Sequence, residues 1–218
     1  PAEIATMVID KLKAFGGMRD VASILTTSTG VAMNWPTSDG TADVGAIVGQ
    51  NTAVSGADIT FGTIGLNPFY YTSNKIALPL ELIQDSAIDV VAYVVDRLAT
   101  RIARIQNTHF TTGAGTTLPD GVIPKSATGK TGTTGQTLTV IYDDLIDLKH
   151  SVNRAYRANA RYMMNDLSVA VVSKLKDTTG RPIWVPAVVA GAPDTLCGFP
   201  VAINDDVAVM AANAKSIA

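Results

Sequence analysis

The sequence predicts an α+β fold, and three observations carry this prediction. Apolar residues recur at helical spacing over residues 80–112, and shorter helical segments follow in the second half of the chain. Runs rich in Val, Thr and Ile, bounded by turn residues, are interspersed with the helices and are typical of strands. Only 17% of the 218 residues are charged, below the ~25% of ordinary soluble domains. With a mean hydropathy of +0.23, the chain is expected to hide part of its surface against other protein chains.

The first sixty residues are predicted to contain a helix, an extended segment and a long loop. Residues 3–15 carry apolar side chains at helical spacing and end at a glycine pair, which predicts a helix. Residues 19–35 favour extended chain, interrupted at Gly30. Residues 36–60 contain four glycines and too few large apolar side chains to fold alone, which predicts a long loop. An ordinary disordered surface loop is the alternative for this segment.

The next part of the chain is predicted to form two strands and one long helix. Residues 61–66 and 69–78 favour strands on either side of Asn67-Pro68. Residues 80–112 then favour a helix that, if continuous, would be roughly 45 Å long. Its predicted apolar face consists of Ile88, Val91, Ala92, Val95, Leu98, Ala99 and Ile102. Its predicted polar face consists largely of Asp89, Asp96, Arg97, Thr100, Arg101 and Arg104.

After a Gly/Thr-rich connection over residues 111–137, the pattern predicts a second mixed half. A helix is expected over residues 143–157, with Leu145, Leu148, Val152 and Tyr156 as its inner stripe. A short strand is expected at residues 162–164. Asn165-Asp166 are expected to cap a third helix that reaches Lys176.

The third helix is expected to end at a turn and two strands. The turn is predicted at residues 177–180, because Asp, Thr and Gly favour this geometry. A short strand is expected around residues 181–184, and a second one is entered through residues 198–201.

Bulk properties narrow the class of protein. The net charge of −2 gives no basic surface for tight binding of nucleic acid. No apolar run approaches the ~18 residues of a membrane helix. Cys197 is the single cysteine, which excludes an intrachain disulfide and favours a reducing cytoplasm. The chain opens at Pro1 without a basic-then-apolar leader, so a secretory precursor is not expected.

The candidate enzyme motifs in the sequence lack residues that their chemistry needs. Thr128-Gly129-Lys130-Thr131 has Pro124 where a phosphate-binding loop needs its first glycine, and later glycines oppose an immediate helix. His109 and His150 fall in separate predicted helices without metal-ligand spacing. Asp143-Asp144 are interpreted as a helix start and Asp205-Asp206 as a solvated turn. We therefore predict no catalytic, cofactor-binding or metal-binding residues.

Three motifs in order carry a resemblance to a known family. Residues 174–203 combine Leu175-Lys176-Asp177 and Gly180 with Trp184 and its following proline, and then Gly198-Phe199-Pro200-Val201. Residues 81–86 and the Gly-rich segment from Phe110 to Ile123 precede them. Together these motifs resemble the tailed-bacteriophage major capsid proteins of the Hong Kong ninety-seven type fold.

The resemblance implies a particular architecture. Residues 1–35 would form an N-terminal segment with the first strands, and residues 36–60 an extended loop that reaches over a neighbouring subunit. Residues 61–137 would form a peripheral domain with its sheet, the long spine helix and the Gly/Thr-rich connection. Residues 138–218 would form a mixed α/β axial domain, without the family's C-terminal strands.

The resemblance also implies a function and partners. The chain would be a structural major capsid subunit of a tailed phage or prophage, which self-assembles into an icosahedral shell around double-stranded DNA. Its partners would be copies of itself in hexamers and pentamers, together with portal and scaffolding or protease proteins. Contact with packaged DNA would be weak and unspecific, and no membrane is involved. The protein would be assembled in the host cytoplasm and located in the virion.

Two alternatives stay open from the sequence. An encapsulin-like compartment subunit would share the fold and enclose cargo protein, and the Thr/Gly/Ala-rich composition leaves a β-rich surface binding module as a third class. Some family members crosslink their shells through a lysine in the extended loop. Residues 36–60 contain no lysine, and the nearest is Lys75, so this role is not carried over.

Overall fold

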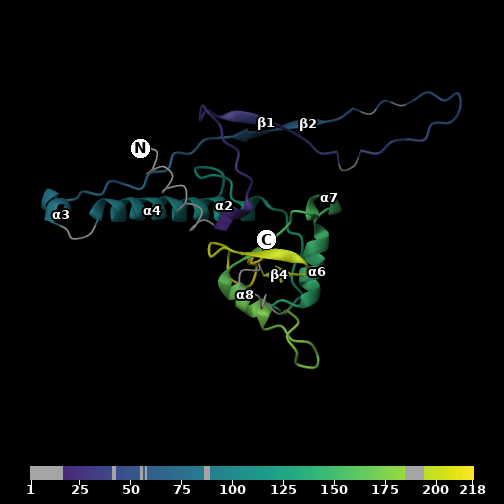
Figure 1. Cartoon of the computed structure of the whole chain (residues 1–218). Helices are drawn as coiled ribbons and strands as arrows, with labels where there is room; N and C mark the ends of the chain where they lie inside the picture. Colours follow the sequence, from purple (N-terminus) through teal and green to yellow (C-terminus); the bar gives the residue numbers. More distant parts are fainter. Residues whose placement is uncertain (1–16, 41–42, 55, 57, 86–88, 185–193) are drawn as a thin grey trace. The chain divides into compact units, whose positions relative to one another are not determined.

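The computed structural model describes residues 17–40, 43–54, 56, 58–85, 89–184 and 194–218 (Figure 1). The chain divides into two compact units. We call Leu25–Tyr70 the arm, and Pro1–Ile24 together with Tyr71–Ala218 the body. The helix expected over residues 3–15 lies outside the described residues.

The arm contains a two-stranded antiparallel ribbon. Strand β1 (Met33–Ser38) pairs with β2 (Phe61–Leu66), so that Met33 lies opposite Leu66 and Ser38 opposite Phe61 (Figure 1). The strand predicted at residues 61–66 is confirmed. β1 takes the first three residues of the predicted loop, while the described residues from 39 to 60 form no helix or strand.

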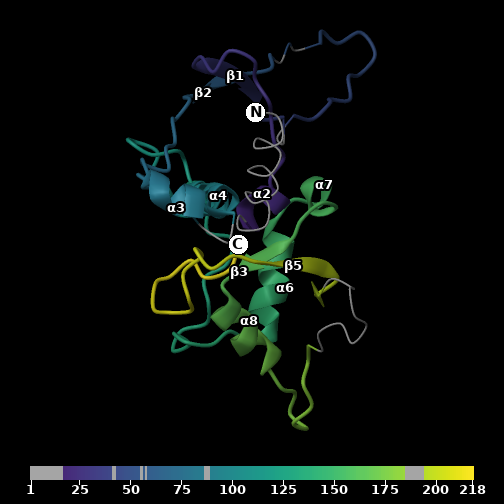
Figure 2. The same cartoon turned by 60° about the vertical axis from the view of Figure 1, so that its left-hand side comes forward.

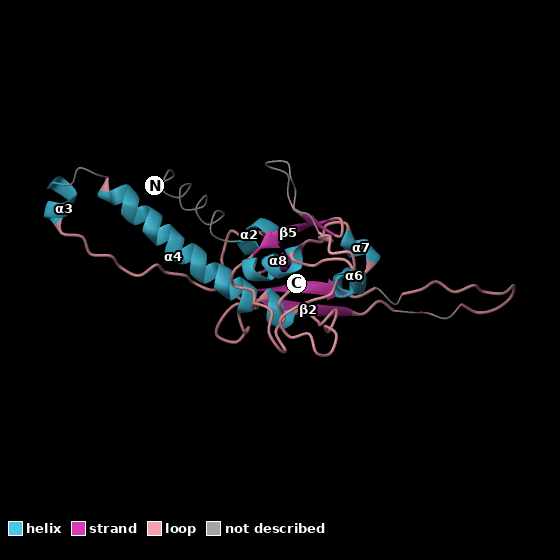
Figure 3. Cartoon of the chain, turned by 90° about the horizontal axis from the view of Figure 1, so that it is seen from below, coloured by secondary structure: helices cyan, strands magenta, loops and turns pink. Residues whose placement is uncertain are grey.

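The long helix of the body is shorter than the sequence suggested. Helix α3 (Leu80–Asp85) is separate from α4 (Val90–Thr112), because Asp89 has an extended backbone and caps α4. The Asp89 Oδ1 atom accepts a hydrogen bond from the Ala92 amide at 3.0 Å. In Figure 3, α4 is one unbroken helix, and its 23 residues give a length of roughly 35 Å.

The buried side of α4 differs from the predicted apolar face. Its buried residues are Val90, Ala99, Thr100, Ala103, Asn107 and Thr111. Most of them are small, which lets neighbouring backbone come close to the helix. Thr100, predicted to be on the polar face, is 6% exposed, whereas Val91, predicted to be inside, is 53% exposed. The larger aliphatic side chains of this helix therefore lie partly at the surface.

The link after α4 explains the Gly-rich motif. The Gly121 amide donates to the Gly113 carbonyl at 2.9 Å, and Ala114 and Asp120 form an isolated bridge. A Cβ atom on Gly113 would lie 2.2 Å from the Pro119 carbonyl oxygen, so only glycine fits this close approach. The short helix α5 (Val122–Lys125), which the sequence did not predict, follows directly.

The C-terminal half of the body is built on a three-stranded sheet in the order β3-β5-β4. Strand β3 (Tyr162–Met164) runs parallel to β5 (Phe199–Ile203), as Figure 2 shows. Strand β4 (Thr195–Leu196), which was not predicted, pairs antiparallel with β5. Cys197 and Gly198 connect the last two strands with positive φ angles of 51° and 86°. This is the geometry of a tight two-residue hairpin.

The helices flanking this sheet depart from the prediction at their ends. Helix α6 (Tyr142–Ser151) stops early, and Asn153 caps the separate helix α7 (Arg154–Arg157). Val152 and Tyr156 are therefore exposed instead of extending the inner stripe begun by Leu145. Helix α8 (Asp166–Ser173) begins at the expected cap, where Asn165 Oδ1 accepts from the Leu167 amide at 3.0 Å, but ends before Lys176.

Other local predictions were partly wrong. The short helix α2 (Gly17–Val21) overlaps the start of the segment 19–35, which was expected to be extended. Residues 69–78 form no strand, and the segment 181–184 contributes only an isolated bridge between Lys176 and Pro182. Neither segment has a partner strand among the described residues, and a strand needs one to satisfy its backbone groups.

The turn predicted at residues 177–180 is confirmed. The Gly180 amide donates to the Asp177 carbonyl at 3.0 Å, and Gly180 has a φ of 84°. The Asp177 carboxylate accepts from the Thr179 hydroxyl and from the Thr179 and Arg181 amides. These hydrogen bonds, led by that from the Thr179 hydroxyl, lower the pKa of Asp177 below its usual value.

Two apolar clusters form the core of the body. The larger one gathers around the sheet and consists of Leu145, Tyr162, Met164, Val172, Trp184, Leu196 and Met210. The smaller one, Met18, Met163 and Val207, lies on the other side of strand β3, because successive strand residues point to opposite faces. Trp184 is anchored by a 2.8 Å hydrogen bond from its Nε1 to the Thr195 carbonyl.

A buried polar network joins α4 to the end of β5. Asn107 Nδ2 donates to Asn204 Oδ1 at 2.8 Å and to Asp206 Oδ2 at 2.5 Å, while its Oδ1 accepts from the Met18 amide at 3.0 Å. Asn204 Nδ2 donates in turn to Thr111 Oγ1 at 2.9 Å. Asn107 is 7% exposed and Asn204 is 2% exposed, so water cannot easily replace these contacts.

This network gives a first testable expectation. Replacing Asn107→Ala should lower the free energy of unfolding by about 2–4 kcal/mol, because the buried Met18 amide loses its side-chain acceptor and Asn204 and Asp206 each lose a hydrogen bond. Asn159→Ala, at an exposed site, is the matched control and should stay within about 0.5 kcal/mol of wild type. Urea unfolding followed by circular dichroism measures both. Equal effects of the two substitutions would show that the network contributes nothing specific.

Candidate assembly surfaces

The structure places each residue that the sequence motifs singled out for chemistry. Lys130, the lysine of the rejected phosphate motif, pairs with the carboxylates of Asp147 and Asp144. The hydrogen bond to Asp147 is the main cause that raises the pKa of Lys130 above its usual value. Asp143 and Asp144 lie in the first turn of α6, as predicted. The lysine therefore ties the Gly/Thr-rich connection to the start of α6.

The two histidines lie on different helices, as expected. His109 of α4 contacts Tyr71, whose hydroxyl is 3.0 Å from His109 Nδ1. His150 of α6 lies 3.3 Å from a guanidinium nitrogen of Arg157. Across the described part of the chain, no group of three or more His, Cys, Asp or Glu side chains could hold a metal ion.

Asp205 and Asp206 were interpreted as a solvated turn, and the structure gives Asp206 a more specific place. Its carboxylate accepts from Asn107 and, at 3.0 Å, from the Thr108 hydroxyl. Together with Asp20, Arg104 and Asn204 these residues line a polar cavity of about 590 Å³ beside α4. The cavity is lined by both carboxylates and a guanidinium, so its surface carries charges of both signs.

Cys197 and two tyrosines meet beneath the β4–β5 hairpin. A hydrogen bond with the Cys197 side chain raises the pKa of Tyr142, and burial raises the pKa of Tyr162. The Tyr162 hydroxyl also donates to the Leu145 carbonyl at 2.7 Å. The cysteine is half-buried in a tight turn, which agrees with a packing role.

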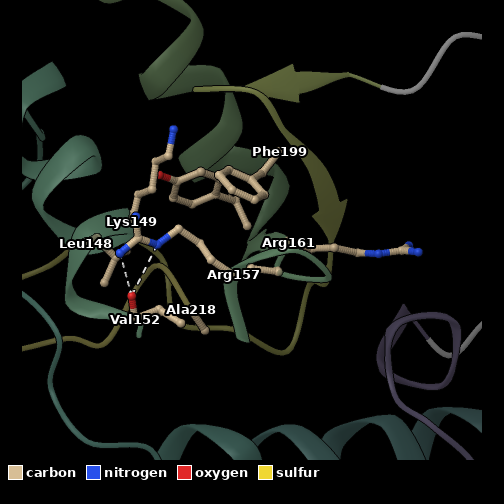
Figure 4. Close-up of a pocket in the computed structure, with 9 residues that line it drawn as sticks. Leu148, Lys149, Val152, Arg157, Arg161, Phe199 and Ala218 are labelled. Atoms are coloured by element: carbon tan, nitrogen blue, oxygen red, sulfur yellow. Dashed lines mark hydrogen bonds between the residues drawn. The ribbon is translucent and has the colours of Figure 1, made fainter. Parts of the chain in front are cut away.

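A small apolar hollow lies between α6, α7 and the sheet. It measures about 80 Å³, and its lining includes Leu148, Val152 and Phe199 (Figure 4). In Figure 4 the Arg157 guanidinium turns toward the Val152 carbonyl, to which it donates at 2.7 Å, whereas Arg161 extends away from the other labelled side chains. The hollow is too small for a drug-sized ligand, which needs roughly 300 Å³ or more.

The arm exposes many large apolar side chains. No described arm residue is buried, and Thr37 alone is half-buried. Its exposed large side chains are Leu25, Val31, Met33, Trp35, Val44, Ile47, Val48, Val54, Ile59, Phe61, Ile64, Leu66, Phe69 and Tyr70. A two-stranded ribbon without a covered face is marginally stable in water. The sequence predicts that residues 36–60 have too few large apolar side chains to fold alone. The structure shows that the large apolar side chains described in this segment are exposed.

The register of the ribbon concentrates these side chains on one face. Trp35 lies opposite Ile64 and Met33 opposite Leu66, and residues two apart on a strand share a face. We call these four side chains the apolar face of the arm. Trp35 is 48% exposed and Ile64 is 55% exposed. The ribbon thus presents a contact surface that its own strands cannot cover.

Helix α4 exposes a second extended surface. Val91, Tyr93 and Ile105 are exposed along it, and the Arg97 guanidinium lies 5.2 Å from the centre of the Tyr93 ring. In the described ranges, no helix is long and apolar enough to span a membrane.

Comparison with known proteins shows which family this chain belongs to. The sequence model described as the Phage capsid family matches residues 1–218. The chain belongs to the Phage capsid family. It is thus a structural capsid subunit, as its sequence motifs indicated.

Solved structures agree with this assignment. The capsid of a native GTA particle is 28% identical over 93% of this chain and 72% of its own, with a TM-score of 0.76. The capsid of an empty GTA particle has the same identity and coverage and a TM-score of 0.74. A structure from Mycobacterium phage Adephagia is 11% identical, covers 93% of this chain and 66% of its own, and supports the fold with a TM-score of 0.59. No curated protein matches the capsid subunit significantly.

The exposed apolar face of the arm can be tested by fluorescence. The capsid subunit contains two tryptophans, Trp35 on the arm and Trp184, which is 5% exposed. In a Trp184→Phe variant of the free subunit, emission should be that of a hydrated indole and should be quenched readily by acrylamide. The matched Trp35→Phe variant, which keeps Trp184, should emit at shorter wavelength and resist quenching. Similar quenching of both variants would mean that the arm is covered within its own subunit.

Proposed function

We propose that this protein is the major capsid subunit of a tailed phage or prophage. Copies of the chain assemble into hexamers and pentamers, and these close into an icosahedral shell that encloses double-stranded DNA. The observation that carries this proposal is the uncovered arm, joined to a body that has its own core. Membership of the capsid family and the likeness to GTA particle capsids support it.

The mechanism we infer is geometric. Residues 138–218 act as the axial domain that packs around symmetry axes, and residues 61–137, including α4, act as the peripheral domain. Residues 36–60 form the extended loop by which one subunit reaches its neighbour, following residues 1–35 of the N-terminal segment. Each contact is weak by itself, but closed symmetry repeats it many times, so the summed contacts hold the shell together.

The role of the protein is structural, and we propose that it has no catalytic, metal or cofactor site. The net charge of −2 supports only weak and unspecific contact with packaged DNA. Its further partners would be portal and scaffolding or protease proteins of the same particle. It would be assembled in the bacterial cytoplasm and remain in the virion.

Electron microscopy of particles made by the full-length protein tests the proposal. Closed shells with five-fold and six-fold clusters are expected, and particles from the native source should contain nuclease-protected double-stranded DNA. Shells filled with a single cargo protein would favour the encapsulin-like alternative, which shares the fold. A protein that stays monomeric at high concentration would contradict a capsid role.

Particle stability is expected to depend on non-covalent contacts alone. Residues 36–60 contain no lysine, so the loop cannot supply the amine for an isopeptide bond. Boiled particles should therefore run as one subunit band on a denaturing gel. A ladder of covalent multimers, lost in a Lys75→Arg variant but kept in Lys125→Arg, would assign a crosslinking role to Lys75.

A further inference from the structure

One stretch of the body concentrates positive charge. Residues 148–165 contain Lys149, Arg154, Arg157 and Arg161 and no Asp or Glu. These four side chains contribute +4 to a chain whose net charge is −2, so the remaining residues carry −6. We call the four side chains the cationic surface. The overall composition therefore conceals a local region of the opposite sign.

The fold gathers these cations in one place. Lys149 of α6, Arg157 of α7 and Arg161, which directly precedes β3, all line the apolar hollow (Figure 4). Arg154 lies three residues before Arg157 on α7, a spacing that makes the two side chains neighbours on a helix. Residues from two helices and from the start of a strand therefore form one region of the surface.

Two of the cations are held in position by their own subunit. The Lys149 Nζ atom donates to the Cys197 carbonyl at 3.0 Å. The Arg157 guanidinium donates to the Val152 carbonyl at 2.7 Å. Both side chains keep further N–H groups for a ligand, because an ammonium has three donors and a guanidinium has five. Their positions beside the hollow are thus fixed before any ligand binds.

The other two cations extend into solvent. Arg154 and Arg161 are exposed, and in Figure 4 Arg161 points away from the other labelled side chains. Within the part of the chain that the structure describes, no carboxylate pairs with any member of the cationic surface. Like charges gathered without a counter-charge repel one another, which lowers the stability of an isolated subunit. A ligand with several negative charges would remove this repulsion.

Neutral side chains of the same segment add hydrogen-bond donors. Tyr156, which lies between Arg154 and Arg157 in the sequence, is 70% exposed, and Asn159 is also exposed. Arg, Lys, Asn and Tyr are among the side chains with which proteins contact DNA phosphates. The segment thus offers donors for phosphate without a carboxylate that would repel it.

The arginines of α4 fit a polyanion less well. Arg97, Arg101 and Arg104 are exposed and occur at i, i+4 and i+7. The Arg97 Nε atom donates to the Tyr93 hydroxyl at 3.0 Å. Arg104 lines the polar cavity together with three aspartates. This row of arginines therefore ends at carboxylates, which would repel a second source of negative charge.

We infer that the cationic surface is where this subunit contacts the phosphate backbone of double-stranded DNA. The inference rests on the proposed capsid function and locates the weak DNA contact within it. A DNA duplex carries one negative charge per roughly 1.7 Å of its axis, so cations without carboxylates attract it whatever its sequence. An acidic protein segment matches less well, because protein interfaces rely on an apolar centre and the hollow here is small.

Binding of duplex DNA by the unassembled full-length subunit tests this assignment. Fluorescence anisotropy of a short labelled duplex gives the binding constant as salt is raised from about 50 to about 200 mM. Each phosphate contact contributes about 0.9 to the slope of log K against log salt. Arg154→Gln with Arg161→Gln should therefore reduce the slope by about 1.8 and weaken binding at least about tenfold at the lowest salt. Two duplexes of unrelated sequence should bind equally, because phosphate contacts carry no sequence information.

Matched variants separate this contact from loss of fold and from general charge. Arg97→Gln with Arg101→Gln makes the same change of charge on α4 and should bind DNA within about twofold of wild type, because distant charges are screened. Arg154→Lys with Arg161→Lys should keep the wild-type slope, since the release of counterions depends on charge. All three variants should unfold at the wild-type urea concentration, because the altered side chains are exposed.

Chemical labelling of arginine locates the contact in the assembled shell. Phenylglyoxal should modify Arg154 and Arg161 much less in DNA-filled particles than in particles that have been emptied and treated with nuclease. Arg101 is the internal control and should react equally in both. Mass spectrometry of the digested subunits measures the modified fraction at each arginine.

Several outcomes would overturn the inference. Wild-type DNA binding by the Arg154→Gln and Arg161→Gln variant would remove the contact, and an equal loss in the α4 variant would spread it over the whole body. Unchanged DNA binding together with loss of particles would assign the cationic surface to a contact between protein chains. Each of these results in a protein whose wild-type particles hold DNA contradicts only the inference. Wild-type particles without DNA would remove the proposed function itself.

Discussion

The structure of the body depends on the hydrogen bonds that Asn107 makes. This side chain binds Met18 of α2, and it binds Asn204 and Asp206 just after β5, and so holds two separate parts of the chain to one turn of α4. An apolar contact would hold them together but would not fix their register, because hydrophobic burial is non-directional. Buried amides accept only arrangements that satisfy each donor and acceptor, so the position of α4 relative to the sheet is specified by a few polar atoms.

Small residues on the inner side of α4 complement this constraint. Ala99, Ala103, Asn107 and Thr111 follow each other at i+4 spacing and let neighbouring backbone approach closely. As a result the larger aliphatic and aromatic side chains of α4 are left for the outer surface. This exposure costs an isolated subunit the stability that burial would give, and we expect that a neighbour in a shell would cover these side chains. The arm shows the same division, since its paired strands satisfy their own backbone while their side chains have no core.

The sequence predicted the order of elements better than their ends. Elements with a local chemical signal were found, including β2, β3, the Asn165 cap of α8 and the turn at residues 177–180. Failures occurred where a distant partner decides the outcome. Residues 69–78 have strand composition but no paired strand, and Val152 has helical spacing but lies beyond the end of α6. The buried face of α4 was misplaced because hydrophobic periodicity favours large residues, whereas close packing selected small ones. The sequence alone shows that the loop has no lysine. It does not show which apolar side chains of the arm share a face, because that depends on how β1 and β2 are paired.

The body has a buried core and the described residues of the arm have none, and this difference affects how subunits assemble. A free arm must pay about 1–2 kcal/mol per residue when its backbone becomes ordered, and its own contacts cannot offset this cost. We therefore expect ordering to be favourable only when a neighbour supplies the missing contacts, which would couple arm folding to subunit association. Such coupling keeps each pairwise contact weak, so wrongly placed subunits can dissociate before the shell closes. Limited proteolysis by an unspecific protease reports this coupling: cleavage within residues 36–60 should be fast in free subunits and suppressed in particles, whereas equal protection in both states would mean that the arm folds onto its own body.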